Sequence, residues 1–315
     1  MSHTNPLHAS QVEPGVYPGI DPQDYHLINE GIDRGDPSWI VSRSDLLDVW
    51  GSPYLWKTGF QSEYGRATHI GSAVDCLALT PEKFGEDFAI MPKTYRAPGK
   101  RKDDPTVEKP WNLNSNDCKA LYAKAVKDGK TPILAGDYDK VLAMVSGLLT
   151  GVINEVGQVG KLVGSSEKQV CVIWDEKIGA TPPVRCRALI DLVPEAPEAG
   201  LIDLKTTGAG LDMRSWVSTC RRSALDFQAA MYRRGYNAAS GEPPREAFSH
   251  LIIDQNPPHL SAMRYLSSDD MTLADRWVDN AISKYTSCLD AGRWPSYADL
   301  GVQEVKLYRR PEHIS

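Results

Sequence analysis

Two aspartates and a lysine lie in two short β-type segments in the second half of the chain. Residues 184–193 (VRCRALIDLV) contain Asp191, and residues 201–205 (LIDLK) contain Asp203 and Lys205. The sequence EAPEAG between them is typical of a turn, so we predict two adjacent antiparallel strands. Asp203 and Lys205 are two positions apart and therefore point to the same face of a strand. The pattern places two carboxylates and an ammonium group near one end of a sheet.

Two carboxylates in this position are suited to a divalent metal ion, because Mg²⁺ and Mn²⁺ prefer oxygen ligands. Such an ion polarises a phosphoryl oxygen and lowers the pKa of a bound water. Lys205 could hold or deprotonate that water and offset charge in the transition state. The tripeptide D-x-K alone is very common, however. Two strand-end aspartates beside a solvent-facing lysine are the alternative interpretation.

Four sequence features occur in a fixed order along the chain. They are GSAVD at 71–75, ALID at 188–191, DLKTT at 203–207 and QAAMY at 228–232. This series resembles the motifs G-x-x-x-H, G-x-x-D, D-x-K and Q-x-x-x-Y of the RecB-type branch of the PD-(D/E)XK nuclease superfamily. Within that branch the sequence is most similar to the phage and prophage exonucleases of the RecE (exodeoxyribonuclease VIII) type.

The likeness extends beyond these motifs. It includes SRSDLLDVWGSPYLWK at 42–57, GSAVDCLALTPEKF at 71–84 and VIWDEKIGA at 172–180, and it covers about residues 15 to 300. Each motif is weak alone, and the ordered set carries the resemblance. It implies an α/β fold with a central mixed sheet flanked by helices, and a helical N-terminal part.

The resemblance also implies the composition of the active site, with Mg²⁺ or Mn²⁺ as cofactor. The predicted metal-binding residues are Asp75, Asp191, Asp203 and Leu204, and the predicted catalytic residues are Asp191, Asp203, Lys205, Gln228 and Tyr232. Gln228 and Tyr232 are four positions apart and share a helix face, on which Arg221 also falls. This helix is implied to flank the metal site and to orient Lys205 and the DNA backbone. A polar stripe on an amphipathic helix is the alternative.

The sequence departs from the family pattern at three positions. Asp75 replaces the family histidine, Ala188 replaces the glycine of the second motif, and Gln169 stands where many relatives carry a glutamate. Asp75 can still bind a hard cation through oxygen, which favours Mg²⁺ or Ca²⁺. A helix residue that is capped or paired elsewhere is an equally weighted interpretation of Asp75.

Periodicity and turn residues indicate the elements that position these residues. We predict helices at 44–56 (with Ser42 or Ser44 as N-cap and a break at Ser52-Pro53), 69–79, 137–150, 221–238 and 273–289. We predict strands at 169–174, 184–193, 201–205, 248–254 and 263–266. The expected organisation is an extended arm at 1–40, one nuclease domain at 41–300 and a tail at 301–315.

The charge balance excludes a strongly basic nucleic-acid binder. The formal net charge is −6 and the isoelectric point about 5.7, but a local basic surface and a carboxylate-bound cation both remain compatible with an anionic substrate. In a loop expected at 91–116, phosphate contact and a solvated surface are alternative roles for Arg96, Lys100, Arg101 and Lys102. Arg185 and Arg187, which share a strand face, have the same two alternatives.

The six cysteines include no CxxC pair, and neither a secretory signal nor an apolar run long enough to span a membrane is visible. We therefore expect reduced thiols in a cytoplasmic protein.

The resemblance predicts a Mg²⁺-dependent exonuclease that digests linear duplex DNA from its ends in recombination. Its implied partners are a single-strand annealing protein and further copies of itself. An endonuclease or end-trimming nuclease on the same core is one alternative. A catalytically inactive DNA-binding subunit is another, which Asp75 and Gln169 motivate.

Overall fold

A six-stranded sheet organises the chain. The computed structural model describes residues 8–60, 66–97, 106–179 and 182–300. Within them the sheet has the order β1-β8-β9-β10-β11-β12, with bounds Gly15–Tyr17, Glu167–Glu176, Val184–Val193, Leu201–Thr207, Phe248–Asp254 and Ser261–Tyr265. Strands β10 and β11 run parallel, and the other neighbouring pairs run antiparallel. The predicted mixed sheet is confirmed.

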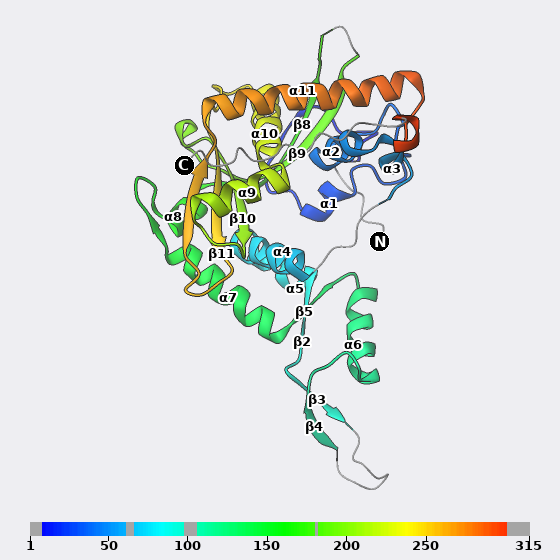
Figure 1. Cartoon of the computed structure of the whole chain (residues 1–315). Helices are drawn as coiled ribbons and strands as arrows, with labels where there is room; N and C mark the ends of the chain where they lie inside the picture. The colour runs from blue at the N-terminus through cyan, green and yellow to red at the C-terminus, as the bar shows by residue number, and fades with distance from the viewer. Residues whose placement is uncertain (1–7, 61–65, 98–105, 180–181, 301–315) are drawn as a thin grey trace, which may run out of the picture.

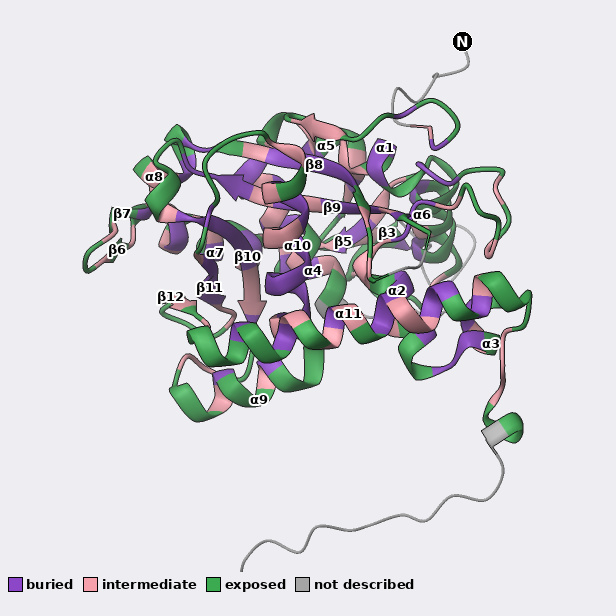
Figure 2. Cartoon of the chain, turned by 90° about the horizontal axis from the view of Figure 1, so that it is seen from above, coloured by how far each residue is buried: buried purple, intermediate pink, exposed green. Residues whose placement is uncertain are grey.

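Helices cover both faces of the sheet (Figure 1). One face packs against α2 (Arg43–Gly51), α3 (Pro53–Lys57), α10 (Leu225–Ala239) and α11 (Ser268–Ala291). The other packs against α4 (Arg66–Leu79), α7 (Ala135–Thr150) and α8 (Val159–Ser165). Figure 2 shows the strands largely buried between these layers, with the outward faces of α9 (Met213–Ser223) and α11 exposed. The predicted α/β class is therefore confirmed.

The predicted helix at 44–56 is interrupted at Ser52, as expected. The Ser42 side chain accepts a hydrogen bond from the backbone of Asp45, whose carboxylate accepts one from the backbone of Ser42, so that α2 begins with a capping box. The Ser52 side chain then caps α3, whose first residue is Pro53.

The single helix predicted at 221–238 is wrong. Ala224 has a φ of 48° and ψ of 49°, in the left-handed region, and this residue separates α9 from α10. A non-glycine residue rarely adopts this conformation, which is why periodicity alone did not indicate the break. Consequently Arg221 does not share a helix face with Gln228.

Residues 8–40, which fall within the predicted arm, pack on the sheet through β1 and α1 (Pro22–His26). Arg187 is buried here and donates to the carbonyl oxygen of Tyr25 at 2.7 Å. Arg185 is paired with Asp175 at 2.8 Å. Both arginines make internal contacts. The two roles predicted for Arg187, phosphate contact and solvent exposure, are therefore both wrong.

An insertion between α4 and α7 projects from the body of the molecule (Figure 1). It contains η1 (Pro81–Lys83), α5 (Phe84–Asp87), β2 (Phe88–Met91), β3 (Thr94–Ala97), β4 (Val107–Pro110), α6 (Asn116–Lys127) and β5 (Thr131–Leu134). The described part of the loop expected at 91–116 therefore contains a β3–β4 hairpin. Arg96 is exposed on β3, whereas Lys100, Arg101 and Lys102 lie outside the described residues. The remaining short elements are β6 (Val152–Ile153), β7 (Gly157–Gln158), η2 (Pro197–Ala199) and η3 (Tyr297–Leu300).

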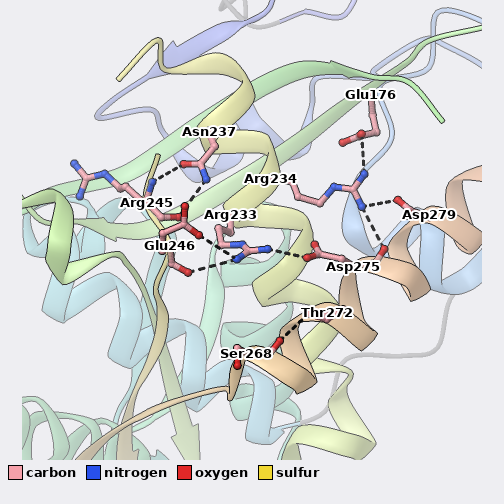
Figure 3. A network of polar contacts seen from close by, with 10 residues as sticks. All are labelled: Glu176, Arg233, Arg234, Asn237, Arg245, Glu246, Ser268, Thr272, Asp275 and Asp279. Atoms are coloured by element: carbon pink, nitrogen blue, oxygen red, sulfur yellow. Dashed lines mark hydrogen bonds and ion pairs between the residues drawn. The ribbon is translucent and has the colours of Figure 1, made fainter. Parts of the chain in front are cut away.

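A network of ion pairs fastens α10 to α11 (Figure 3). Arg233 contacts Asp275, and Arg234 contacts both Asp279 on α11 and Glu176 at the end of β8. These contacts fix the orientation of α10, which also carries Gln228 and Tyr232.

In the described part of the chain, no helix combines the length and the apolar character needed to cross a bilayer. All six cysteines are buried and unpaired, as predicted for reduced thiols.

Candidate active site

Strand β10 places Asp203 and Lys205 on the same face of the sheet. Ile202 and Leu204 point the other way, into the core formed with α4 and α7. Asp203 is almost fully buried, with 2% of its surface exposed, and its Oδ2 forms an ion pair with Nζ of Lys205. No other described residue donates a hydrogen bond to Oδ2. The Lys205 ammonium group is therefore the partner of this carboxylate oxygen.

Asp191 on β9 is held against the backbone of β10. Its Oδ2 accepts a hydrogen bond from the backbone nitrogen of Leu204 at 2.7 Å. The side chain of Leu204 is buried, so this residue could contact a metal ion only through its carbonyl oxygen. That oxygen lies 3.5 Å from Nζ of Lys205. The structure therefore brings Asp191, Asp203, Leu204 and Lys205 together.

Helix α4 contributes Asp75 from the opposite side. A Cβ atom on Gly71, which begins this motif, would lie 3.3 Å from Oγ1 of Thr206, so glycine permits the close approach of α4 to β10. Asp75 and Lys205 line the same cleft, and Oδ1 of Asp75 is buried without a hydrogen-bond partner among the described residues. Asp75 therefore lies in the cleft beside Lys205, where the sequence predicts a metal-binding residue.

Burial and neighbouring charges shift the pKa values of Asp75, Asp191 and Lys205. Burial raises the pKa of Asp75 to about 7, with Lys205 acting against this shift and Asp203 adding to it. Burial, Asp203 and Asp75 likewise raise the pKa of Asp191 well above its usual value. Burial disfavours the charged form of Lys205, but the three carboxylates outweigh it and raise the pKa of the ammonium group. Lys205 is therefore a cation, suited to offset charge rather than to remove a proton.

The donor set of this cluster fits a hard divalent cation. It offers carboxylate oxygens: Oδ1 of Asp75 has no hydrogen-bond donor among the described residues, and Oδ2 of Asp203 contacts the Lys205 ammonium group. Within the described ranges, no three His, Cys, Asp or Glu side chains converge closely enough to hold an ion as they stand. A cation would therefore have to draw the carboxylates together, and it would relieve their repulsion.

Helix α10 contributes Gln228, which is buried and donates from Nε2 to Oδ1 of Asp203 at 2.7 Å. Tyr232, one turn later, is 8% exposed and lies in the core, where its ring packs edge-on against Phe248. Gln228 thus contacts the carboxylate cluster directly, whereas Tyr232 packs behind it and does not line the cleft.

The cleft beside the cluster has a volume of about 480 Å³. Its walls come from α4, the end of β10 with the turn that follows, and α9, and its lining includes Thr68, Ser72, Thr206, Thr219, Arg222, Ser223 and Gln255. Arg221 lies instead on the outer side of α9. Because the Ala224 break rotates α9 relative to α10, Arg222 and not Arg221 faces the cleft.

Sequence reasoning also missed His250. It is paired with Asp203 in the β10–β11 register and is 1% exposed, and its Nε2 has no partner among the described residues. Burial lowers the pKa of this imidazole to about 4, so it is neutral. A histidine within an apolar strand gives no signal of such a position in the sequence.

Comparison with solved structures gives a match for the fold. The crystal structure of a candidate exonuclease from Eubacterium rectale matches with a TM-score of 0.53 and 12% identity, over 92% of this chain and 96% of that one. Rai1 from Candida albicans in complex with pU5 and Mn²⁺ matches with a TM-score of 0.29 and 13% identity, over 85% and 69% of the two chains, too distant for any inference. No curated protein matches the chain significantly.

A family model described as a PDDEXK-like domain of unknown function (DUF3799) matches residues 55–302, which is most of the chain. Domains of this nuclease fold generally use divalent metal ions. The chain therefore belongs to this family and, through it, to the PD-(D/E)XK nuclease superfamily.

Proposed function

We propose that the chain is a metal-dependent nuclease that hydrolyses phosphodiester bonds of DNA. The observation that carries this proposal is the buried carboxylate of Asp203, which contacts Lys205 on one side and Gln228 on the other. Asp191 and Asp75 stand close enough to repel it. A structural ion pair would not require three crowded carboxylates for one lysine.

Each residue of the cluster has a role in this reaction. Asp191, Asp203, Asp75 and the carbonyl oxygen of Leu204 would hold Mg²⁺ or Mn²⁺, which when bound supplies Lewis-acid polarisation of the phosphoryl group and activation of the attacking water. The Lys205 ammonium offsets the negative charge that develops on the phosphoryl oxygens during in-line attack. Gln228 fixes the orientation of the Asp203 carboxylate through its hydrogen bond, and Tyr232 supports α10 from the core.

We further propose that the substrate is linear duplex DNA, digested from an end during recombination. The resemblance to RecE-type exonucleases and the fold shared with a candidate exonuclease support this choice. A single-strand annealing protein and further copies of the chain are the proposed partners.

The first test compares linear duplex DNA with covalently closed DNA of the same sequence, in Mg²⁺ or Mn²⁺ and in EDTA. We expect release of nucleotides from the linear form alone, with none in EDTA. Cleavage of both forms would identify an endonuclease. If neither form is cut, the nuclease proposal fails.

The second test is Lys205→Ala. We expect the rate of cleavage to fall by at least about a hundredfold, because charge stabilisation in the transition state is lost. Circular dichroism should show an unchanged fold, and a wild-type rate for this variant would exclude the role assigned to Lys205.

A further inference from the structure

Helix α9 presents three different faces to its surroundings. Trp216 and Cys220, four positions apart, are buried and pack with Leu225 and Ile252. Met213, Arg214, Val217, Ser218 and Arg221 border a separate hollow on the outer side. Thr219, Arg222 and Ser223 line the cleft that contains Asp75 and Lys205. The buried face anchors the helix, so the other two faces are held in fixed directions.

The end of α9 is fixed as well. Arg43 on α2 donates through its guanidinium to the carbonyl oxygens of Ser223 and Ala224, where the chain turns into α10. The backbone at Arg222 is therefore fixed by the buried face of α9 and by Arg43.

The guanidinium group of Arg222 has no hydrogen-bond or ion-pair partner among the described residues that form the cleft. The side chains of most described arginines contact a carboxylate or a carbonyl oxygen. Those of five make no hydrogen bond or ion pair with another described residue: Arg96, Arg214, Arg221, Arg222 and Arg276. Of these five, Arg222 is the one that lines the cleft. Its guanidinium thus has its full set of donors available.

Several other side chains of the cleft wall are polar. Gln255 donates to Oγ1 of Thr206 at 3.3 Å and accepts from Nζ of Lys140 at 3.4 Å. The hydroxyl groups of Ser72 and Ser223 also line the cleft. Hydroxyl, amide and guanidinium groups are the side chains that bind phosphate groups of a nucleic acid backbone. The positive charge of Arg222 also reduces the repulsion between the acidic cluster and a polyanion.

We propose that Arg222 forms a binding subsite for a backbone phosphate next to the one that is cleaved. This inference rests on the proposed function, because it assigns the cleft to a nucleic acid substrate. Arg222 lines the same cleft of about 480 Å³ as Asp75 and Lys205, so a strand bound at the cluster would bring a neighbouring phosphate into the space that Arg222 borders.

The neighbouring arginines provide a matched pair of variants for the test. Arg221→Ala and Arg222→Ala remove the same charge from adjacent positions of one helix, but only the second removes it from the cleft. Binding of a fluorescent single-stranded oligonucleotide is measured by anisotropy at several salt concentrations. Ca²⁺ is the sole divalent ion, and a denaturing gel checks that the strand stays intact.

We expect Arg222→Ala to raise Kd about tenfold, the usual loss for a hydrogen bond to a charged group. The slope of log K against log salt should fall by about 0.7, because one phosphate contact of a single strand is lost. Arg221→Ala should leave both quantities within twofold of wild type. Arg222→Lys should keep the salt slope and recover part of the affinity, since it retains the charge without the planar fork.

Equal losses in the two alanine variants, or an unchanged salt slope in Arg222→Ala, would overturn the subsite. The binding readout also separates this inference from the nuclease proposal. If Arg222→Ala loses binding while the wild type cuts no DNA with any divalent ion, the subsite stands and the nuclease proposal fails. If the wild type cuts DNA and Arg222→Ala binds like wild type, the nuclease proposal stands and the subsite fails.

Discussion

Helix α10 carries two groups of polar side chains that differ in how their charges are compensated. In its C-terminal half, Arg233 and Arg234 each contact carboxylates on neighbouring elements, and these contacts remain partly exposed to solvent (Figure 3). In its N-terminal half, Gln228 contacts a buried cluster in which three carboxylates share the single ammonium group of Lys205.

The difference indicates that one group of charges stabilises the fold and the other serves a different purpose. Each partly buried arginine at the α10–α11 contact has carboxylate partners that offset its desolvation, so these pairs stabilise the orientation of α10. Crowded, buried carboxylates destabilise the fold unless a cation joins them, so a benefit other than stability must maintain them. Substitutions in the two groups should therefore have opposite effects on activity and on stability.

The largest effect is expected from Asp191→Asn. The asparagine keeps an acceptor for the backbone nitrogen of Leu204 but removes one negative charge from the cluster. Cleavage of linear duplex DNA in Mg²⁺ should fall by at least about a hundredfold, because a metal ligand is lost. In metal-free buffer the Tm should be equal to or higher than that of the wild type, because repulsion with Asp203 and Asp75 is relieved. A lower Tm would show that repulsion from Asp191 does not destabilise the metal-free fold.

A second effect, on stability alone, is expected from Arg234→Ala. This substitution leaves Glu176 and Asp279 without their guanidinium partner. We expect a loss of about 2 kcal/mol in the free energy of unfolding, measured with urea, and an unchanged cleavage rate at temperatures where the variant is folded. Arg276→Ala is the control, since this exposed arginine on the same contact helix has no partner among the described residues. A drop in cleavage for Arg234→Ala would show that the two groups are coupled through α10.

Much of this comparison follows from sequence and some of it does not. The alternation in β9 and β10 predicts that Asp191, Asp203 and Lys205 meet, because a strand has a fixed two-residue period. The strand 248–254 is also predicted at its observed bounds, since its run of apolar residues suits a buried parallel strand.

The elements around the site were less predictable. Ala224 adopts a left-handed conformation that alanine does not favour, and the apolar pattern continues across it. The error at this one residue assigned the site-facing role to Arg221 instead of Arg222. His250 was missed because its position depends on the pairing of β10 with β11, a contact between segments far apart in the chain. The roles of the site residues and the domain boundaries remain predictions.

The smallest effect is expected from Gln228→Met, which joins the two groups of α10 in one experiment. Methionine fills a similar volume but cannot donate to Oδ1 of Asp203. The Asp203 carboxyl group should lose its fixed orientation, so we expect cleavage to fall about tenfold, which corresponds to about 1.4 kcal/mol of activation free energy. The ion pairs of Arg233 and Arg234 lie one to two turns farther along the helix and should be unaffected, so the urea midpoint should change less than for Arg234→Ala. If Gln228→Met instead cleaves at the wild-type rate while its stability falls, Gln228 belongs with the structural contacts of α10 and the active cluster is confined to the strands and α4.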